Sequence, residues 1–174
     1  MEQKKQLNTT LTLIMDGDNV LLGQKKRGFA KGTFNGIGGK QDPGETIEQA
    51  MIRETQEEIG VTPLGTKLVA NIDFLNINYK GERVNINLSV YTSNGYKGEI
   101  QETDEMIPYW FNKNHLPFEQ MLPDDVLWFN KVFNGNFIKG TIKYDDNMNR
   151  IAYNITEEKQ QPKKQNQEEE KEKQ

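Results

Sequence analysis

The chain has no cysteine and only one histidine among its 174 residues. Without cysteine there can be no disulfide, no thiolate zinc site and no thiol nucleophile. A single histidine, His115, excludes a metal centre built from several imidazoles and disfavours Ser–His catalysis. Any chemistry must therefore come from carboxylates, lysine, arginine, hydroxyls, the backbone or a bound metal.

Long apolar runs are also absent. No segment approaches the roughly 18 apolar residues of a membrane-spanning helix, and the first ten residues lack the apolar stretch of a signal peptide. We therefore expect a cytoplasmic monomer with no membrane partner. The 26 acidic residues outnumber the 22 basic ones, so overall charge predicts no stable nucleic-acid binding.

Hydrophobic residues make up only 34% of the chain, and part of this deficit is local. Residues 157–174 contain no aliphatic or aromatic side chain. Such a segment cannot offset the entropy of ordering. We therefore expect one folded domain, residues 1–156, followed by a disordered charged tail, residues 157–174.

Apolar alternation and turn signals predict an α+β fold, with a mixed sheet and two helices packed on it. The predicted strands span residues 9–15, 20–24, 65–79, 83–93, 106–111, 137–144 and 150–155. Helices are predicted over residues 46–59, where Gly60 ends the helix, and over residues 124–133. Seven of the 15 glycines lie within residues 23–44, which predicts a loop whose backbone approaches a partner closely.

The first predicted helix carries a cluster of carboxylates. At 100° per residue, Glu54, Glu57 and Glu58 lie on one face, one turn beyond apolar residues that point the same way. Like charges this close repel each other unless a cation with oxygen preference lies among them, and Mg²⁺ is commonly held by carboxylates together with substrate phosphates. Taken alone, the cluster is also compatible with a solvated acidic helix face.

The glycine-rich segment before this helix is basic. Residues 19–41 contain no acid but five bases, Lys25, Lys26, Arg27, Lys31 and Lys40. A basic loop beside an acidic helix suggests a site for a polyphosphate bridged by metal, although a solvated loop would have the same composition. Lys25 is the best candidate for phosphate contact because it directly follows an apolar strand.

Residues 39–61 read GKQDPGETIEQAMIRETQEEIGV and resemble the signature box of the Nudix hydrolase family. The fixed positions that match are Gly39, Glu45, Arg53, Glu54, Glu57, Glu58 and Gly60. Chance agreement at this spacing is on the order of 10⁻⁹ per starting position, so the motif is highly specific. The family usually has an aliphatic residue at Thr55, and we interpret this departure as a change in packing.

The resemblance implies the Nudix fold, an α/β/α sandwich with a mixed β-sheet, and hydrolysis of a phosphoanhydride in a nucleoside diphosphate linked to another group. It implies Mg²⁺ as cofactor, with Mn²⁺ able to replace it. The implied metal ligands are Glu54, Glu57, Glu58, the Gly39 carbonyl and, from outside the box, Glu105. Arg53 and Glu45 would support and orient these carboxylates. Such hydrolysis mainly needs charge neutralisation, positioning and an activated water.

Segments outside the box, residues 21–40, 104–111, 116–121 and 123–125, resemble the MutT-type oxidised-purine nucleoside triphosphatases, closest to the animal type. These enzymes cleave nucleotides of the 8-oxo-dGTP and 2-oxo-dATP type to the monophosphate and pyrophosphate, which keeps the nucleotide pool clean for DNA synthesis. By this likeness the substrate-binding residues are Thr10, Lys25, Phe29, Asn35, Phe74, Ile86, Leu122, Asp124 and Asp125.

Leu122 departs from this likeness, because animal-type enzymes carry a tryptophan there that stacks on the base. A leucine side chain supplies no aromatic face. Two adjacent carboxyls near a base can exchange a proton, which would accommodate more than one purine tautomer. Asp124 and Asp125 could instead cap a helix after Pro123, and Phe29 and Phe74 could be ordinary core residues.

Two other functions stay open from the sequence. One keeps the chemistry but changes the substrate to a dinucleoside polyphosphate or an RNA 5′ end. The other is a catalytically inactive Nudix module that senses nucleotides. The intact set of Glu54, Glu57 and Glu58 argues against the inactive module, since the cluster is costly without metal.

Overall fold

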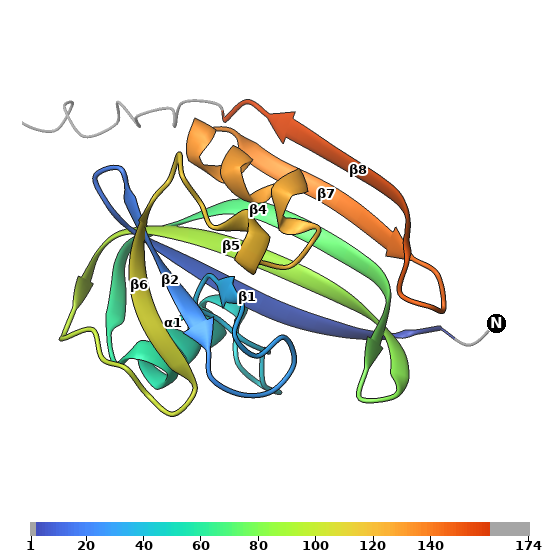
Figure 1. Ribbon diagram of the computed structural model, residues 1–174, viewed down its shortest axis with the longest axis horizontal. Coiled ribbons are helices and arrows are strands. Elements are labelled where there is room, and N and C mark those ends of the chain that lie inside the picture. Colours follow the sequence, from blue (N-terminus) through green and yellow to red (C-terminus); the bar gives the residue numbers. More distant parts are fainter. Residues whose placement is uncertain (1–2, 161–174) are drawn as a thin grey trace, which may run out of the picture.

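The computed structural model describes residues 3–160, which form one twisted mixed sheet with a single α-helix on one face (Figure 1). The strands are β1 (Lys5–Asp16), β2 (Asn19–Lys25), β3 (Phe34–Asn35), β4 (Thr62–Tyr79), β5 (Glu82–Lys97), β6 (Met106–Asn112), β7 (Phe137–Tyr144) and β8 (Arg150–Glu158). The helix α1 spans Ile47–Ile59, and three short 3₁₀ segments follow β6: η1 (Phe118–Gln120), η2 (Asp125–Leu127) and η3 (Phe129–Asn134).

The sheet order is β3-β2-β1-β5-β4-β7-β8, and β6 pairs with the other edge of β2. The β1–β5 and β4–β7 pairs are parallel and the remaining pairs are antiparallel. β1 pairs with β2 only over Ile14–Asp16. Nearer the start of β1, the glycine-rich segment pairs with the same edge of the strand, through isolated bridges at Thr9 and Thr12. The predicted α+β class with a mixed sheet is confirmed.

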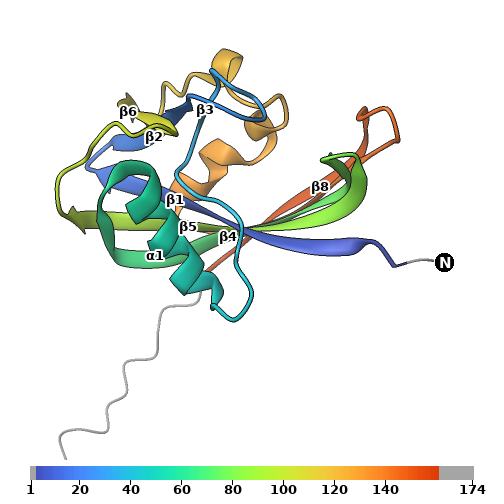
Figure 2. The same ribbon diagram turned by 90° about the horizontal axis from the view of Figure 1, so that it is seen from below.

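The two faces of the sheet are covered differently (Figure 2). On one face, a large apolar core gathers side chains of β1, β4, β5 and β7 under the 3₁₀ segments, with Trp128 and Phe129 almost fully buried. On the other face, α1 packs through Met51, Thr55 and Ile59. The sheet therefore separates an α1 face from a 3₁₀ face, and the site residues divide between these two faces.

The predicted first helix is present, with Thr46 as its N-cap. The Thr46 side chain accepts from the Gln49 amide N–H, and the Gln49 side chain accepts from the Thr46 N–H, which is a capping box. Gly60 ends the helix in the left-handed conformation at φ 79°. Both ends of the helix are thus fixed by local sequence.

The prediction of a regular second helix over residues 124–133 is wrong. This stretch forms η2 and η3, separated at Trp128, whose φ of −139° is not helical. Aspartate, valine, asparagine and the aromatic residues that dominate the stretch are weak helix formers, so burial of the Trp128 and Phe129 rings decides the backbone path. The second covering layer therefore consists of 3₁₀ turns.

The strand β8 extends further than expected. Glu157 and Glu158, which we assigned to the charged tail, pair with Ile138 and Phe137 of β7. Lys159 and Gln160 follow without regular structure, and residues 161–174 of the predicted tail lie outside the described residues. Within residues 3–160, no helix is long and apolar enough to cross a bilayer.

Thr55 anchors α1 to the sheet, which is more than the change in packing that we interpreted from the sequence. Its buried hydroxyl donates to the Met51 carbonyl at 2.8 Å and lies 3.1 Å from the hydroxyl of Thr12 in β1, which is also fully buried. One proton cannot serve both partners, so the Thr12 hydroxyl donates to Thr55. The two threonines form a hydrogen-bonded pair inside the helix–sheet interface, with Thr12 as donor and Thr55 as acceptor.

This pair predicts a non-additive result for valine substitutions. Thr55→Val should lower the free energy of unfolding by about 1–3 kcal/mol, because it leaves the Thr12 hydroxyl buried without a partner. The double variant Thr12→Val/Thr55→Val should recover most of that loss, since both polar groups are then removed. Urea unfolding of the four proteins measures the coupling, and purely additive losses would contradict the pairing.

Candidate functional site

The glycine-rich segment is fastened to β1 through its backbone. The Thr10 N–H donates to the Gly39 carbonyl at 2.9 Å, and Ile37 and Thr12 exchange two backbone bonds. A side chain at Gly38 would lie 1.8 Å from the Thr10 carbonyl oxygen, and one at Gly39 would lie 2.4 Å from the carboxyl carbon of Glu54. Only glycine allows this close approach, which sets the Gly39 backbone directly against the first carboxylate of α1.

Arg53 organises the carboxylates around α1. Its Nε and Nη2 bind the two oxygens of Glu45 at 3.0 and 2.7 Å, and its Nη1 donates to Glu54 at 3.0 Å and to Glu57 at 3.2 Å. Nη2 also donates to the Lys40 carbonyl at 3.0 Å, so the guanidinium joins the helix to the loop. The fork geometry of arginine makes this possible, because it presents donors to several acceptors in one plane.

Glu45 in turn holds the loop at the start of α1. Its Oε1 accepts from the Asp42 amide at 2.7 Å in addition to the Arg53 bond. These bonds, with that of Arg53 foremost, lower the pKa of Glu45. Glu45 is therefore an ionised anchor of Arg53, consistent with a supporting and not a reacting group.

Glu58 and Glu54 are the desolvated carboxylates of the cluster. Burial is the main cause that raises the pKa of Glu58 to about 8, and the charges of Glu54 and Glu105 add to it. Burial also raises the pKa of Glu54, against the effect of Arg53. The Gly38 amide donates to Glu58 at 3.1 Å, and this bond and the charge of Lys25 act in the opposite direction.

Glu105 and Lys25 therefore belong to the same electrostatic neighbourhood as the box, although they come from outside the helix. Glu105 directly precedes β6 and forms an ion pair with Arg27 at 2.8 Å. The Lys25 ammonium group, at the end of β2, donates to the Phe29 carbonyl at 2.6 Å. Pairing of β2 with β6 brings the basic loop and this extra carboxylate together beside α1.

The donor set fits a hard divalent cation. The charge of the half-buried Glu54 helps to raise the pKa of the buried Glu58, and the charges of Glu57 and Glu105 help to raise that of Glu54. The Gly39 backbone lies close to the Glu54 carboxylate. Oxygen ligands of this kind suit Mg²⁺ or Mn²⁺. In residues 3–160, however, no three acidic or imidazole groups converge as they stand, because Arg53 draws Glu54 and Glu57 to itself.

The second group of candidate residues lies on the 3₁₀ face. Phe74 of β4 packs on the large core and pairs with Ile86 of β5. Asp125 is buried, its amide donates to the Leu122 carbonyl at 3.0 Å, and its Oδ2 has no hydrogen-bond partner within the described part of the chain. Neither Asp124 nor Asp125 caps η2 through its side chain, so the capping alternative does not explain them.

Three candidate residues lie elsewhere. Thr10 pairs with Ser89, whereas its neighbour Leu11 packs in the large core, so strand alternation places Thr10 on the α1 face. Its buried hydroxyl has no partner among residues 3–160. The ring of Phe29 is 80% exposed, and the Asn35 side chain accepts from the Gly36 amide at 2.8 Å. Thr10 thus lies on the opposite face of the sheet from Phe74, and the Phe29 ring faces solvent.

Two residues near Asp124 were not identified from the sequence. Tyr144 of β7 donates its hydroxyl to Asp124 Oδ2, and Arg150 of β8 binds Asp124 Oδ1 at 2.9 Å. They are cross-strand partners in the β7–β8 hairpin. Neither belongs to a motif, and only the hairpin register, which local patterns do not give, could have indicated them.

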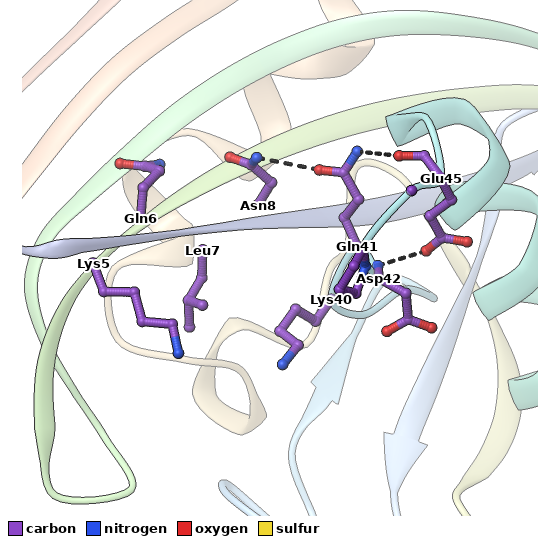
Figure 3. A pocket seen from close by; sticks show the side chains of 10 residues that line it. Lys5, Gln6, Leu7, Asn8, Lys40, Gln41, Asp42 and Glu45 are labelled. Carbon is purple, nitrogen blue, oxygen red and sulfur yellow. Dashed lines mark hydrogen bonds between the residues drawn. The ribbon is translucent and has the colours of Figure 1, made fainter.

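Two pockets lie beside the candidate residues and not over them. One, of about 410 Å³, lies between the start of β1 and residues 40–45, where Lys5 and Lys40 flank Leu7 (Figure 3). The other, of about 310 Å³, lies near Phe118 and Phe133. The first adjoins the loop that carries Gly39 and Glu45, but none of the carboxylates of Glu54, Glu57 and Glu58 lines it.

Comparisons with known proteins agree with this geometry. The NUDIX domain model matches residues 5–134. The oxidized purine nucleoside triphosphate hydrolase of Danio rerio is 42% identical over 135 residues, 78% of this chain and 85% of that protein. The Mus musculus protein of the same name is 34% identical over 148 residues, 85% and 93% of the two chains. The MutT protein of Bacillus halodurans superposes with a TM-score of 0.71 at 25% identity, covering 86% and 97%.

Burial of Asp125 predicts a pH effect on stability. Desolvation is the main cause that raises its pKa to about 7 from an ordinary value near 4. Since the folded pKa lies above the unfolded one, the contribution of the neutral carboxyl is complete below about pH 4 and is lost as the pH rises through about 7. The free energy of unfolding of the wild type should therefore fall between about pH 5 and about pH 8. In Asp125→Asn this fall should be smaller by about 2 kcal/mol.

Thermal or urea unfolding of the ligand-free protein at the two pH values measures this difference. Asp104→Asn, at an exposed position, is the matched control and should keep the wild-type pH dependence. An equal pH dependence in Asp125→Asn and wild type would show that Asp125 is ionised when folded.

Proposed function

Because the chain belongs to the Nudix family, we propose that it hydrolyses oxidised purine nucleoside triphosphates, of the 8-oxo-dGTP and 2-oxo-dATP type, to the monophosphate and pyrophosphate with Mg²⁺ as cofactor. The observation that carries the proposal is the Arg53-centred carboxylate cluster held against Gly39. Relatives that share this activity in their names cover most of the chain at 34–42% identity.

The α1 face would carry the phosphate chemistry. Glu54, Glu57, Glu58, the Gly39 carbonyl and Glu105 would hold the metal, which supplies charge neutralisation and a more acidic bound water. Arg53 orients Glu54 and Glu57, and Glu45 fixes Arg53. Lys25 and the buried Thr10 hydroxyl lie on the phosphate side, and a carboxylate of the cluster would take the proton of the attacking water.

The 3₁₀ face would hold the base. Phe74 and Ile86 provide an apolar wall, and Asp124 and Asp125 provide polar groups for the purine edge. Asn35, Leu122 and Phe29 would complete this side of the site, Phe29 only if its exposed ring turns onto the substrate. The glycine-rich segment at the edge of β1 lies where the two faces meet, so a bound nucleotide would pass across this edge.

Glu57→Gln tests the hydrolytic assignment. The neutral amide keeps the shape of the side chain but removes one negative charge from the proposed metal site, so turnover should fall at least about 100-fold. Release of pyrophosphate from 8-oxo-dGTP, measured with and without Mg²⁺ and coupled to a pyrophosphatase, gives the rate. Glu48→Gln, on the exposed side of the same helix, should stay close to wild type. Activity above about a tenth of wild type in Glu57→Gln would rule out the metal assignment.

Leu122→Trp tests the base site. If Leu122 covers the base, an aromatic ring there should lower the Michaelis constant for 8-oxo-dGTP about tenfold, because base–aromatic stacking contributes about 1–3 kcal/mol. Steady-state kinetics measure the change, and Leu64→Trp, on an exposed and remote strand position, is the control. An unchanged Michaelis constant would remove Leu122 from the base site.

A further inference from the structure

Arg27, in the basic segment of residues 19–41, forms an exposed ion pair with Glu105, the proposed metal ligand that lies outside α1. Arg27 Nη2 donates to Glu105 Oε1 at 2.8 Å, and the two side chains are 64% and 41% exposed. Within residues 3–160 the Arg27 guanidinium has no second hydrogen-bond acceptor, whereas Arg53 donates to several acceptors on α1 and on the loop before it. Exposed ion pairs contribute little stability, so Arg27 can change its partner far more easily than Arg53.

The backbone around this ion pair is fixed, although its side chains are exposed. The Lys26 N–H donates to the Glu105 carbonyl at 3.0 Å, and the Glu105 N–H donates to the Thr103 hydroxyl at 3.3 Å. The same hydroxyl donates to the Glu58 carbonyl at 2.7 Å, near the end of α1. Glu105 is thus tied to the backbone of Glu58 through Thr103, and its carboxylate can change partner by rotation of its own side chain.

The position of Glu105 exposes its carboxylate to two kinds of cation. Its charge acts on both Glu54 and Glu58, which places it in the electrostatic neighbourhood of the proposed metal site. Arg27 binds the same carboxylate from the basic segment. A carboxylate that is bound by a guanidinium is a weaker ligand for a divalent cation, because the two positive charges repel each other.

We propose that Arg27 competes with the metal for the Glu105 carboxylate and that the displaced guanidinium binds a phosphate of the nucleotide. This competition rests on the proposed function, since the metal and the nucleotide are those of the proposed reaction. A phosphate that binds Arg27 frees Glu105 for the metal, and release of Arg27 from Glu105 frees the guanidinium for the phosphate. By linkage, each ligand then raises the affinity for the other by the same factor.

A phosphate is the acceptor that fits a displaced Arg27. The planar guanidinium presents paired donors that match two phosphate oxygens. Residues 19–41 contain no acid, so the segment that carries Arg27 offers it no other carboxylate. Lys26 is bound to Glu102 at 2.9 Å, which holds this segment in place while the Arg27 side chain turns.

Mn²⁺ binding to the full-length protein without nucleotide, followed by the EPR signal of the free ion, tests the competition in the absence of turnover. Arg27→Gln should bind Mn²⁺ about threefold more tightly than the wild type, because no guanidinium then contests Glu105. In steady-state hydrolysis of 8-oxo-dGTP at saturating Mg²⁺, the same variant should raise KM about tenfold with little change in kcat, because a charge-assisted phosphate contact is lost. Lys31→Gln removes the same charge from an exposed position of the same segment and should match the wild type in both measurements.

Substitution of Glu105 separates this competition from a general effect of charge. In a Glu105→Gln background, Arg27→Gln should no longer tighten Mn²⁺ binding, since the contested carboxylate is gone. Unchanged or weaker Mn²⁺ binding in Arg27→Gln, or a gain that persists in the Glu105→Gln background, would overturn the competition, and an unchanged KM would overturn the phosphate contact. A wild type that hydrolyses no oxidised purine nucleotide would refute the proposed function, and the Mn²⁺ titration would still decide whether Arg27 contests Glu105.

Discussion

The hydrogen bonds of Arg53 fix the carboxylates on the α1 face of the sheet. Three carboxylates and a loop carbonyl accept hydrogen bonds from its guanidinium. The helix α1, which carries Arg53, is fixed at its start by Thr46 and at its end by Gly60. Without this cation, Glu45, Glu54 and Glu57 would repel one another across a partly desolvated space. Among residues 3–160, the side chain of Glu58, the most buried of the cluster, accepts a hydrogen bond from the Gly38 amide alone. Neutralisation by arginine and the proposed binding of a metal would thus be complementary parts of one electrostatic arrangement.

The carboxylate face of α1 could be predicted from the sequence because helix spacing and helix caps are local features. The spacing of Glu54, Glu57 and Glu58 fixes a common helix face, and the Gly39 segment requires glycine at positions where a Cβ would collide with β1 or with Glu54. The mixed sheet likewise followed from alternating strands, such as Val84 to Val90 in β5. The bounds of α1 followed from a capping threonine and a terminal glycine. The common helix face and the bounds of α1 depend on residues within a few positions of each other.

The surroundings of Asp124 and Asp125 were harder to predict, because they depend on long-range packing. Nothing near residues 124–133 signals that Trp128 leaves helical geometry, since the buried positions keep a helical spacing and only the core decides the path. The partners of Asp124 come from a hairpin some twenty residues further on, through a register that is set by a bulge. Thr10 and Phe74 were both predicted to bind substrate, and strand alternation next to Leu11 places Thr10 on the α1 face, whereas Phe74 packs on the large core. Thr55 illustrates the same limit, as its role depends on Thr12, 43 residues away.

The β7–β8 hairpin lies at one margin of the sheet, and most side chains of β8 face solvent. Side-chain changes there would disturb little packing, yet Tyr144 and Arg150 bind Asp124, which is proposed to meet the base. The proposed hydrolytic centre around Arg53 lies across the sheet and shares no hydrogen bond with this hairpin among the described residues. With this layout, substitutions in the β7–β8 hairpin could change the base preference of related proteins during evolution while the proposed hydrolytic centre stays the same.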